Sequence, residues 1–298
     1  MSSRRLVSLL SVLGVGAAAS LGACAATVSP SGSGSGHGSS DTGSQVSAVN
    51  VTADVDPKTG SIVLPIDRFF LSESELADIE SAHGLAMGSC TAAHGYNYGS
   101  TKVIPEIGGQ RNYGVWVMTN AEQFGYEVPA SPAKQAALQR NSDPSQAPTD
   151  AQLSIIKACA HTPDAQALEE TSVRASSLFG DATTGLGDKA LASAKARQVI
   201  GQWAACLTAK GLQRNLSGGP FNIKGVTEGI TESNIRIAVQ DVQCKDQVDL
   251  VRRMATIDAS FQAPVVKKYA AELTELRVCY DKLVSRARTY LTAHAPVD

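Results

Sequence analysis

The chain has 298 residues, a formal charge of −2 at neutral pH, and only 5% aromatic residues. Its 26 Lys and Arg residues are scattered and form no dense basic stretch, which argues against nucleic acid as a partner. The length fits one large domain or two small ones, and the frequent alanine and glycine residues suit closely packed helices.

The first residues are typical of an export signal. Met1–Arg5 is a short basic segment, and residues 6–20 form an apolar run that is short for a membrane span of about 20 residues. The next residues, Leu21 to Cys24, resemble a bacterial lipobox, in which a leucine and two small residues precede a cysteine. The resemblance implies that the chain is cut before Cys24, which then carries a diacylglyceryl thioether and acyl chains such as palmitate. The alternative is an ordinary secretory signal with a stray cysteine.

These features divide the chain into a signal peptide over 1–23, a lipidated tether over 24–50 and an extracytoplasmic domain over 51–298. The Ser/Gly-rich tether should be flexible, and some 24 residues of this kind reach roughly 25–30 Å. Two acyl chains would hold the protein at the outer face of the cytoplasmic membrane. We treat 51–165 and 166–298 as two halves of one domain.

The first half of the domain should contain one short strand, over 60–65, and three helices. Each helix begins with a capping box, in which a polar cap residue is followed three residues later by Glu or Gln. The boxes at Ser72, Thr119 and Thr149 predict helices over 72–94, 119–125 and 149–161.

Residues 96–148 are rich in Gly, Pro and Asn and predict an irregular surface excursion of a kind that often carries binding residues. The excursion is rich in aromatic residues, namely Tyr96, Tyr98, Tyr113, Trp116, Phe124 and Tyr126. These side chains form either an exposed platform for a glycan or peptide, or a satellite core beneath the loop. In the platform interpretation, Tyr113, Trp116 and Tyr126 are the candidate contacts with a partner, because aromatic side chains often act as hot spots.

The second half is predicted to begin with a helix-compatible segment over 164–179 and then to form a helical hairpin. Apolar residues at three- to five-residue steps indicate one helix over 191–207 and another over 235–254. The Asn/Gly/Pro-containing segment 215–220 indicates the loop between them. A disulfide across such a hairpin would contribute roughly 4 kcal/mol.

The last part of the chain carries an apolar stripe from Tyr269 to Leu291 that repeats at three- and four-residue steps. Such a coiled-coil-like stripe is expected to pack on the hairpin. Pro264 should break or kink the preceding helix near Phe261, because proline has no N–H to donate.

Five cysteines follow the lipobox cysteine, and sequence alone allows fifteen arrangements of two pairs with one cysteine left over. We assign Cys90 to Cys159 and Cys206 to Cys244 because each pair joins helices that are neighbours in chain order. Cys279 is then expected to be a buried free thiol. The predicted fold is mainly α, a disulfide-braced helical bundle with a long C-terminal helical hairpin and a short extended N-terminal segment.

Several short motifs occur in a characteristic order: 65–67 (PID), Cys90 before Gly95, 111–114 (RNYG), 203–206 (WAAC) and 241–245 (DVQCK). With them, residues 60–290 resemble actinobacterial extracytoplasmic lipoproteins of unassigned function. The resemblance implies an exported, helix-rich protein with paired cysteines, supplies no catalytic residues, and points to export or envelope machinery as a partner. Cys279 falls outside the paired positions of that pattern.

A zinc site could be drawn from two Cys–His pairs, Cys90 with His94 and Cys159 with His161. The spacing of the second pair is short for the common zinc motif, and an oxidising compartment favours disulfides. We therefore expect no metal and no other cofactor.

Two motifs of penicillin-recognising serine enzymes also occur, Ser-x-x-Lys at 131–134 and Lys-Thr-Gly at 58–60. They stand in the reverse of the usual order and lack the Ser-x-Asn element between them, so chance explains both. No catalytic residue is assigned.

Two functions of different classes remain. The preferred hypothesis is a membrane-anchored binding or accessory lipoprotein that docks on an envelope or transport protein through its helical surfaces. The alternative is a cell-envelope hydrolase whose site is assembled from separated residues and is not recognisable in the sequence.

Overall fold

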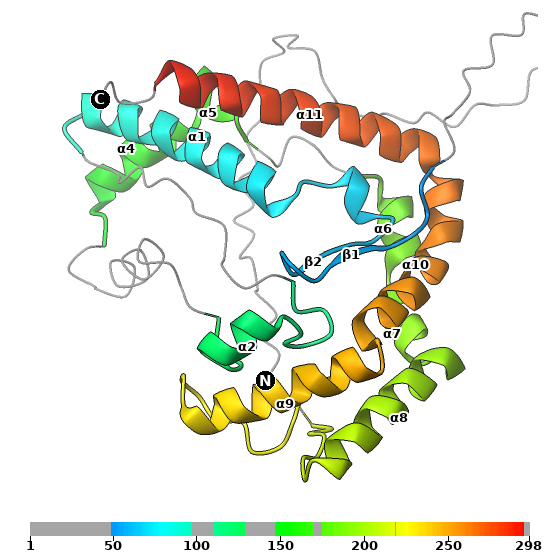
Figure 1. Cartoon of the computed structure of the whole chain (residues 1–298). Coiled ribbons are helices and arrows are strands. Elements are labelled where there is room, and N and C mark those ends of the chain that lie inside the picture. The colour runs from blue at the N-terminus through cyan, green and yellow to red at the C-terminus, as the bar shows by residue number, and fades with distance from the viewer. Residues whose placement is uncertain (1–48, 97–109, 129–146, 170–174, 218, 295–298) are drawn as a thin grey trace, which may run out of the picture.

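The computed structural model describes residues 49–96, 110–128, 147–169, 175–217 and 219–294. Within these ranges the chain is mainly helical, with one small antiparallel hairpin (Figure 1). The helices are α1 (Glu73–Ala93), α2 (Met118–Phe124), α4 (Asp150–Ala160), α5 (Pro163–Ala167), α6 (Ser177–Thr183), α7 (Leu186–Leu191), α8 (Ala194–Ala209), α9 (Glu232–Gln247), α10 (Leu250–Lys268) and α11 (Ala270–Ala293). The predicted mainly α, disulfide-braced fold is confirmed.

The hairpin pairs β1 (Asp54–Asp56) with β2 (Ser61–Val63), with Val55 opposite Ile62. The Asp56 side chain accepts hydrogen bonds from the Lys58 amide and the Thr59 hydroxyl, which closes the turn before Gly60 (φ +75°). The strand predicted over 60–65 corresponds to β2, whereas its partner strand β1 was not predicted. The Lys-Thr-Gly sequence is therefore part of a β-turn.

Two of the three capping boxes form as predicted. Ser72 caps α1 by accepting from the Glu75 amide, and Thr149 caps α4 by accepting from the Gln152 amide. The third prediction, at Thr119, is wrong because α2 begins at Met118 after Val117, which makes no side-chain cap.

The prediction for 235–254 is also incorrect, because the chain breaks into α9 and α10 at Val248–Asp249. Asp249 has a left-handed backbone (φ +50°), and its amide bonds to the Asp246 carbonyl. The 164–179 segment likewise divides, into α5 and α6, with residues 170–174 outside the described part of the chain.

The sequence predicted a break or a kink near Phe261. The break does not occur, since α10 continues through Pro264 to Lys268. Both ends of α10 are held in core, Met254 in one cluster and Val266 in another, which keeps the helix continuous across the proline. The sharp change of direction comes at Tyr269, where α11 turns back over the molecule (Figure 1).

Because of that turn, α11 packs along α1 and not on the hairpin, which corrects the prediction for the C-terminal stripe (Figure 1). The stripe residues are buried as predicted. Leu273, Leu276 and Leu283 join Ile79 and Ala82 of α1 in the second hydrophobic cluster.

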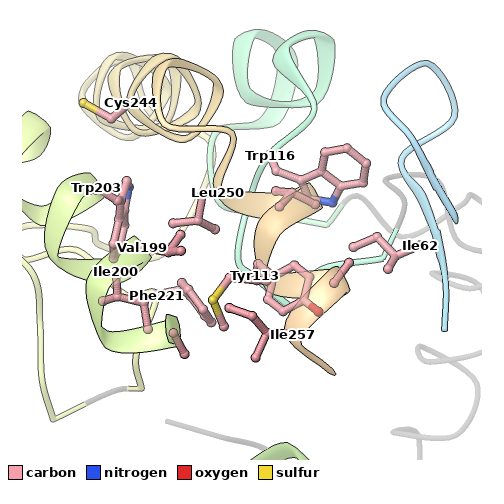
Figure 2. Close-up of a cluster of buried hydrophobic side chains, with 14 of the residues drawn as sticks. Ile62, Tyr113, Trp116, Val199, Ile200, Trp203, Phe221, Cys244, Leu250 and Ile257 are labelled. Carbon is pink, nitrogen blue, oxygen red and sulfur yellow. The ribbon is translucent and has the colours of Figure 1, made fainter. Parts of the chain in front are cut away.

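The first hydrophobic cluster lies around α8 and the start of α10 (Figure 2). Trp203 is fully buried there, with its ring 5.9 Å from that of Phe221, which in turn meets Tyr113 edge-on at 5.6 Å. Burying aromatic side chains of this size supplies much of the hydrophobic stabilisation of such a core.

Candidate functional site

The aromatic residues proposed as partner contacts do not form an exposed platform. Tyr113 and Trp116 are 3% and 6% exposed, and both point into the first hydrophobic cluster (Figure 2). The Tyr113 hydroxyl donates to Asp258 at 2.5 Å, and the Trp116 indole donates to the Gln110 carbonyl at 2.7 Å. The platform interpretation is wrong for these two residues, since their polar ends are satisfied inside the protein.

Tyr126 is partly buried, and its hydroxyl donates to Asp241 at 3.1 Å. Of the other aromatic residues in the excursion, Tyr98 lies outside the described residues. The satellite-core interpretation therefore describes Tyr113, Trp116 and Tyr126 better, and the binding surface has to be sought elsewhere.

A buried polar network joins two of the sequence motifs. Asp241 and Lys245, one turn apart on α9, form a 2.9 Å ion pair with both side chains fully buried. The Trp203 indole donates to the other Asp241 oxygen at 2.9 Å, and the Lys245 ammonium donates to the Val115 carbonyl at 2.6 Å. The same ammonium lies 5.5 Å from the centre of the Trp203 ring.

Burial raises the pKa of Asp241 and lowers the pKa of Lys245, while the attraction between the two charges opposes both shifts. Every polar atom of the pair has a partner, so the network serves the packing of α8, α9 and the 113–117 segment. The sequence analysis joined the two motifs through Cys206 and Cys244 but did not predict the ion pair or its hydrogen bond to Trp203; the four-residue spacing of Asp241 and Lys245 was the available signal.

The predicted disulfides are both present. Cys90 bonds Cys159, joining α1 to α4, and Cys206 bonds Cys244, joining α8 to α9. His94 lies near the first pair, and its ring nitrogen could complete a three-ligand cluster with the two sulfurs. Because both sulfurs are in the disulfide, no thiolate is left there to bind a metal.

Cys279 is not the free thiol that was expected. It is disulfide-bonded.

An open groove of about 700 Å³ runs along one face of α11. One wall is formed by α5 and the residue that follows it, with Asp164, Ala167 and Leu168, and the other by α11 from Val278 to His294. Leu168 is buried at the base, whereas Val278 is 45% exposed, so an apolar side chain is accessible from solvent. Sequence reasoning missed this surface because it depends on where α5 lies against α11.

The charged residues that line the groove differ in whether they form ion pairs. Asp281 accepts two hydrogen bonds from Arg277, which also pairs with Glu75. Arg286 donates to the Ala167 carbonyl at 2.6 Å and thereby links the two walls. Among the described residues neither Lys282 nor Arg286 forms an ion pair, and Asp164 is the other acidic residue of the walls.

At the far end of the groove, the His294 ring stacks on Tyr290 with centroids 4.0 Å apart. Burial and the nearby Asp164 carboxylate raise the pKa of Tyr290, so its hydroxyl is a neutral donor or acceptor at physiological pH.

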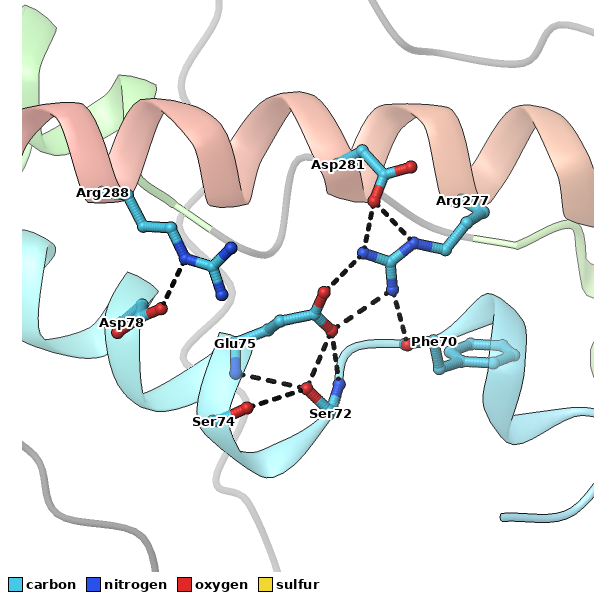
Figure 3. Close-up of polar contacts among 8 residues, drawn as sticks. All are labelled: Phe70, Ser72, Ser74, Glu75, Asp78, Arg277, Asp281 and Arg288. Atoms are coloured by element: carbon cyan, nitrogen blue, oxygen red, sulfur yellow. Dashed lines mark hydrogen bonds and ion pairs between the residues drawn. The ribbon is translucent and has the colours of Figure 1, made fainter. Parts of the chain in front are cut away.

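A polar network holds α11 rigidly against α1 behind this groove (Figure 3). Arg277 donates to both carboxylate oxygens of Glu75, at 2.8 and 3.3 Å, and to the Phe70 carbonyl. Glu75 also accepts from the Ser72 amide and so completes the cap of α1. A second ion pair, Arg288 with Asp78, lies further along the same helices at 2.8 Å.

The described residues contain no histidine side chain hydrogen-bonded to a serine, cysteine or carboxylate of the described part. Ser131 and Lys134 lie outside the described residues. The hydrolase alternative thus gains no support from the described geometry.

The structure is that of a disulfide-braced helical protein with an open groove along its C-terminal helix. Comparisons with protein-family models, curated proteins and solved structures found no match. None of the helices described combines the length and the hydropathy that crossing a membrane requires.

Proposed function

We propose that this protein is an extracytoplasmic lipoprotein, anchored through Cys24, that binds an envelope or transport protein in the groove along α11. The observation that carries the proposal is the groove itself, an open surface that combines an apolar base with charged side chains, Lys282 and Arg286 beside Asp164 and Asp281. Exposed surfaces of this mixed character are common at protein interaction sites.

The position of the tether supports the proposal. The described chain begins at Val49, which packs against the second hydrophobic cluster together with Val51. The same cluster contains Leu168, which lines the groove. A lipid at Cys24 would therefore keep the groove-bearing half within roughly 25–30 Å of the membrane surface, the reach of the tether.

Such a tether lowers the affinity that the groove needs for its partner. Confinement near the membrane raises the effective concentration of the groove toward membrane neighbours, so a weak contact suffices. A partner in the same membrane fits this arrangement better than a diffusible one.

Isolation from gently solubilised membranes tests the proposal. The variant Ser285→Arg/Thr289→Arg places two large side chains in the groove, and Thr208→Arg/Thr256→Arg places them on exposed positions of α8 and α10. We expect a protein that accompanies the wild type and the α8/α10 variant to be absent from the groove variant. The same proteins recovered with all three would contradict the proposal.

A further inference from the structure

We propose that the occupant of the groove is an amphipathic helix of the partner, with an apolar stripe flanked by acidic side chains. The inference rests on the proposed function and names the chemistry of the segment that the groove binds. It follows from the shape of the groove, the arrangement of its charges and the rigidity of its back wall.

The shape fits a helix. Val278, Lys282, Ser285, Thr289 and Ala293 succeed one another at three- and four-residue steps, so they line one face of α11. At 1.5 Å per residue, the face from 278 to 293 is about 22 Å long, which matches four turns of a second helix.

The small side chains of Ser285, Ala293 and Ala167 let a partner helix approach closely, and the exposed Val278 offers an apolar contact. Because the walls stay open to solvent along their length, a small molecule would not reach the enclosure of roughly 70–90% that is usual for such ligands. Recognition by a helix laid into a groove needs no such enclosure.

The charges select an acidic flank. Lys282 and Arg286 lie one turn apart, and neither has a carboxylate partner among the described residues. Arg286 is already oriented by its bond to the Ala167 carbonyl, so little rotamer freedom is lost when it binds. Two carboxylates at a four-residue spacing on the partner would match this pair, although the two acidic residues of the walls, Asp164 and the Arg277-bound Asp281, carry the opposing charge.

The back wall is preformed. The ion pairs of Arg277 with Glu75 and of Arg288 with Asp78 link α11 to α1, so the groove face does not have to be ordered on binding (Figure 3). Preorganised surfaces of this kind lose less free energy on association.

A helical-peptide display library tests the inference directly. Its members, of about 18 residues or five turns, share a leucine stripe, and their flanking positions are randomised among Glu, Lys and Gln. Selection against the full-length protein in detergent should enrich Glu at two flanking positions four residues apart.

The selected peptide should bind Lys282→Glu/Arg286→Glu roughly tenfold or more weakly than wild type, as measured by fluorescence polarisation. A matched variant, Lys195→Glu/Lys267→Glu, reverses two exposed charges outside the groove and should bind as wild type does. Far-ultraviolet circular dichroism and intact disulfides confirm that each variant is folded.

Absence of enrichment, enrichment of Lys or Gln, or equal loss in both variants would overturn the inference. So would binding of anionic lipid vesicles that depends on Lys282 and Arg286 when no peptide binds. A failed selection combined with loss of a membrane partner in the groove-filled variant would reject the acidic helix and leave the proposed function standing. Failure of both experiments would reject the proposed function as well.

Discussion

At the scale of single residues, the buried Asp241–Lys245 ion pair is costly to form. Two charges are taken out of water, and their attraction offsets that cost only because each remaining polar atom is hydrogen-bonded. Trp203 and the Val115 carbonyl provide those bonds, which ties the network to the packing of three segments.

We predict that Lys245→Met lowers the free energy of unfolding by about 3–5 kcal/mol, because Asp241 would be left buried without its cation. The double variant Asp241→Asn/Lys245→Met should lose less, since the asparagine oxygen can still accept from Trp203. Denaturant unfolding followed by tryptophan fluorescence measures both. Lys267→Met, at an exposed position, is the control and should stay within about 0.5 kcal/mol. A double variant as unstable as the single one would contradict this account.

Glu75 gives a prediction with a definite pH dependence. Burial alone would raise its pKa, but hydrogen bonds from Ser72 and Arg277 outweigh burial and lower the pKa. A carboxyl whose folded pKa is lowered contributes stability above its unfolded pKa, near 4.5, and loses that stability as the pH falls through the folded pKa.

Glu75→Gln should therefore cost about 1 kcal/mol at pH 7, a value reduced by solvent screening of the site. The cost should be smaller at pH 3 than at pH 7, because the stabilisation by the ionised carboxyl declines below the unfolded pKa. Glu73→Gln, in the same helical turn but without the arginine contact, should show little effect at either pH. Equal destabilisation by Glu75→Gln at both pH values would rule out the ion pair as the cause.

At the scale of elements, local chemistry identified much of the structure. Ser72 and Thr149 predict the starts of their helices because a capping box satisfies backbone groups within one turn. The two disulfides were predicted from the order of the helices along the chain. These signals lie within a few residues of the feature that they specify.

The features that were missed depend on distant contacts. The residues next to Asp249 in the sequence do not require a left-handed backbone. The burial of Leu250 and Val251 in the first cluster stabilises that turn. The partner of α11 follows from the turn at Tyr269, which periodicity cannot predict. The groove could not be found either, because it depends on where α5 is placed against α11.

The cysteines give a prediction that joins structure to processing. Cys279 is disulfide-bonded, and Cys24 is the one cysteine of the sequence outside the described residues. A thioether and a disulfide cannot share one sulfur, so a lipid on Cys24 and a bond from Cys24 to Cys279 exclude each other.

Non-reducing peptide mapping of the membrane-bound protein should recover Cys90 linked to Cys159 and Cys206 linked to Cys244. It should also yield an acylated N-terminal peptide that begins at Cys24, and Cys24→Ala should leave an uncleaved or mislocalised precursor. A peptide that links Cys24 to Cys279 would reject the lipid anchor, as would detergent-phase partitioning of a mature Cys24→Ala protein.

At the scale of the whole molecule, the two hydrophobic clusters are joined through α10, and the groove lies over the second one. The first described residues, with Val49 and Val51, pack against the same cluster. The proposed function depends on this coincidence, since an anchor and a binding surface on one half of the molecule can act together.

Photo-crosslinking in intact membranes tests that central claim most directly. A photoreactive amino acid replaces Ser285 in the groove or, as a control, Thr208 on the exposed face of α8. We predict a discrete adduct with a membrane protein from position 285 and none from position 208, with loss of the adduct when Thr289→Arg fills the groove. Equal adducts from both positions, or none from position 285, would contradict the account.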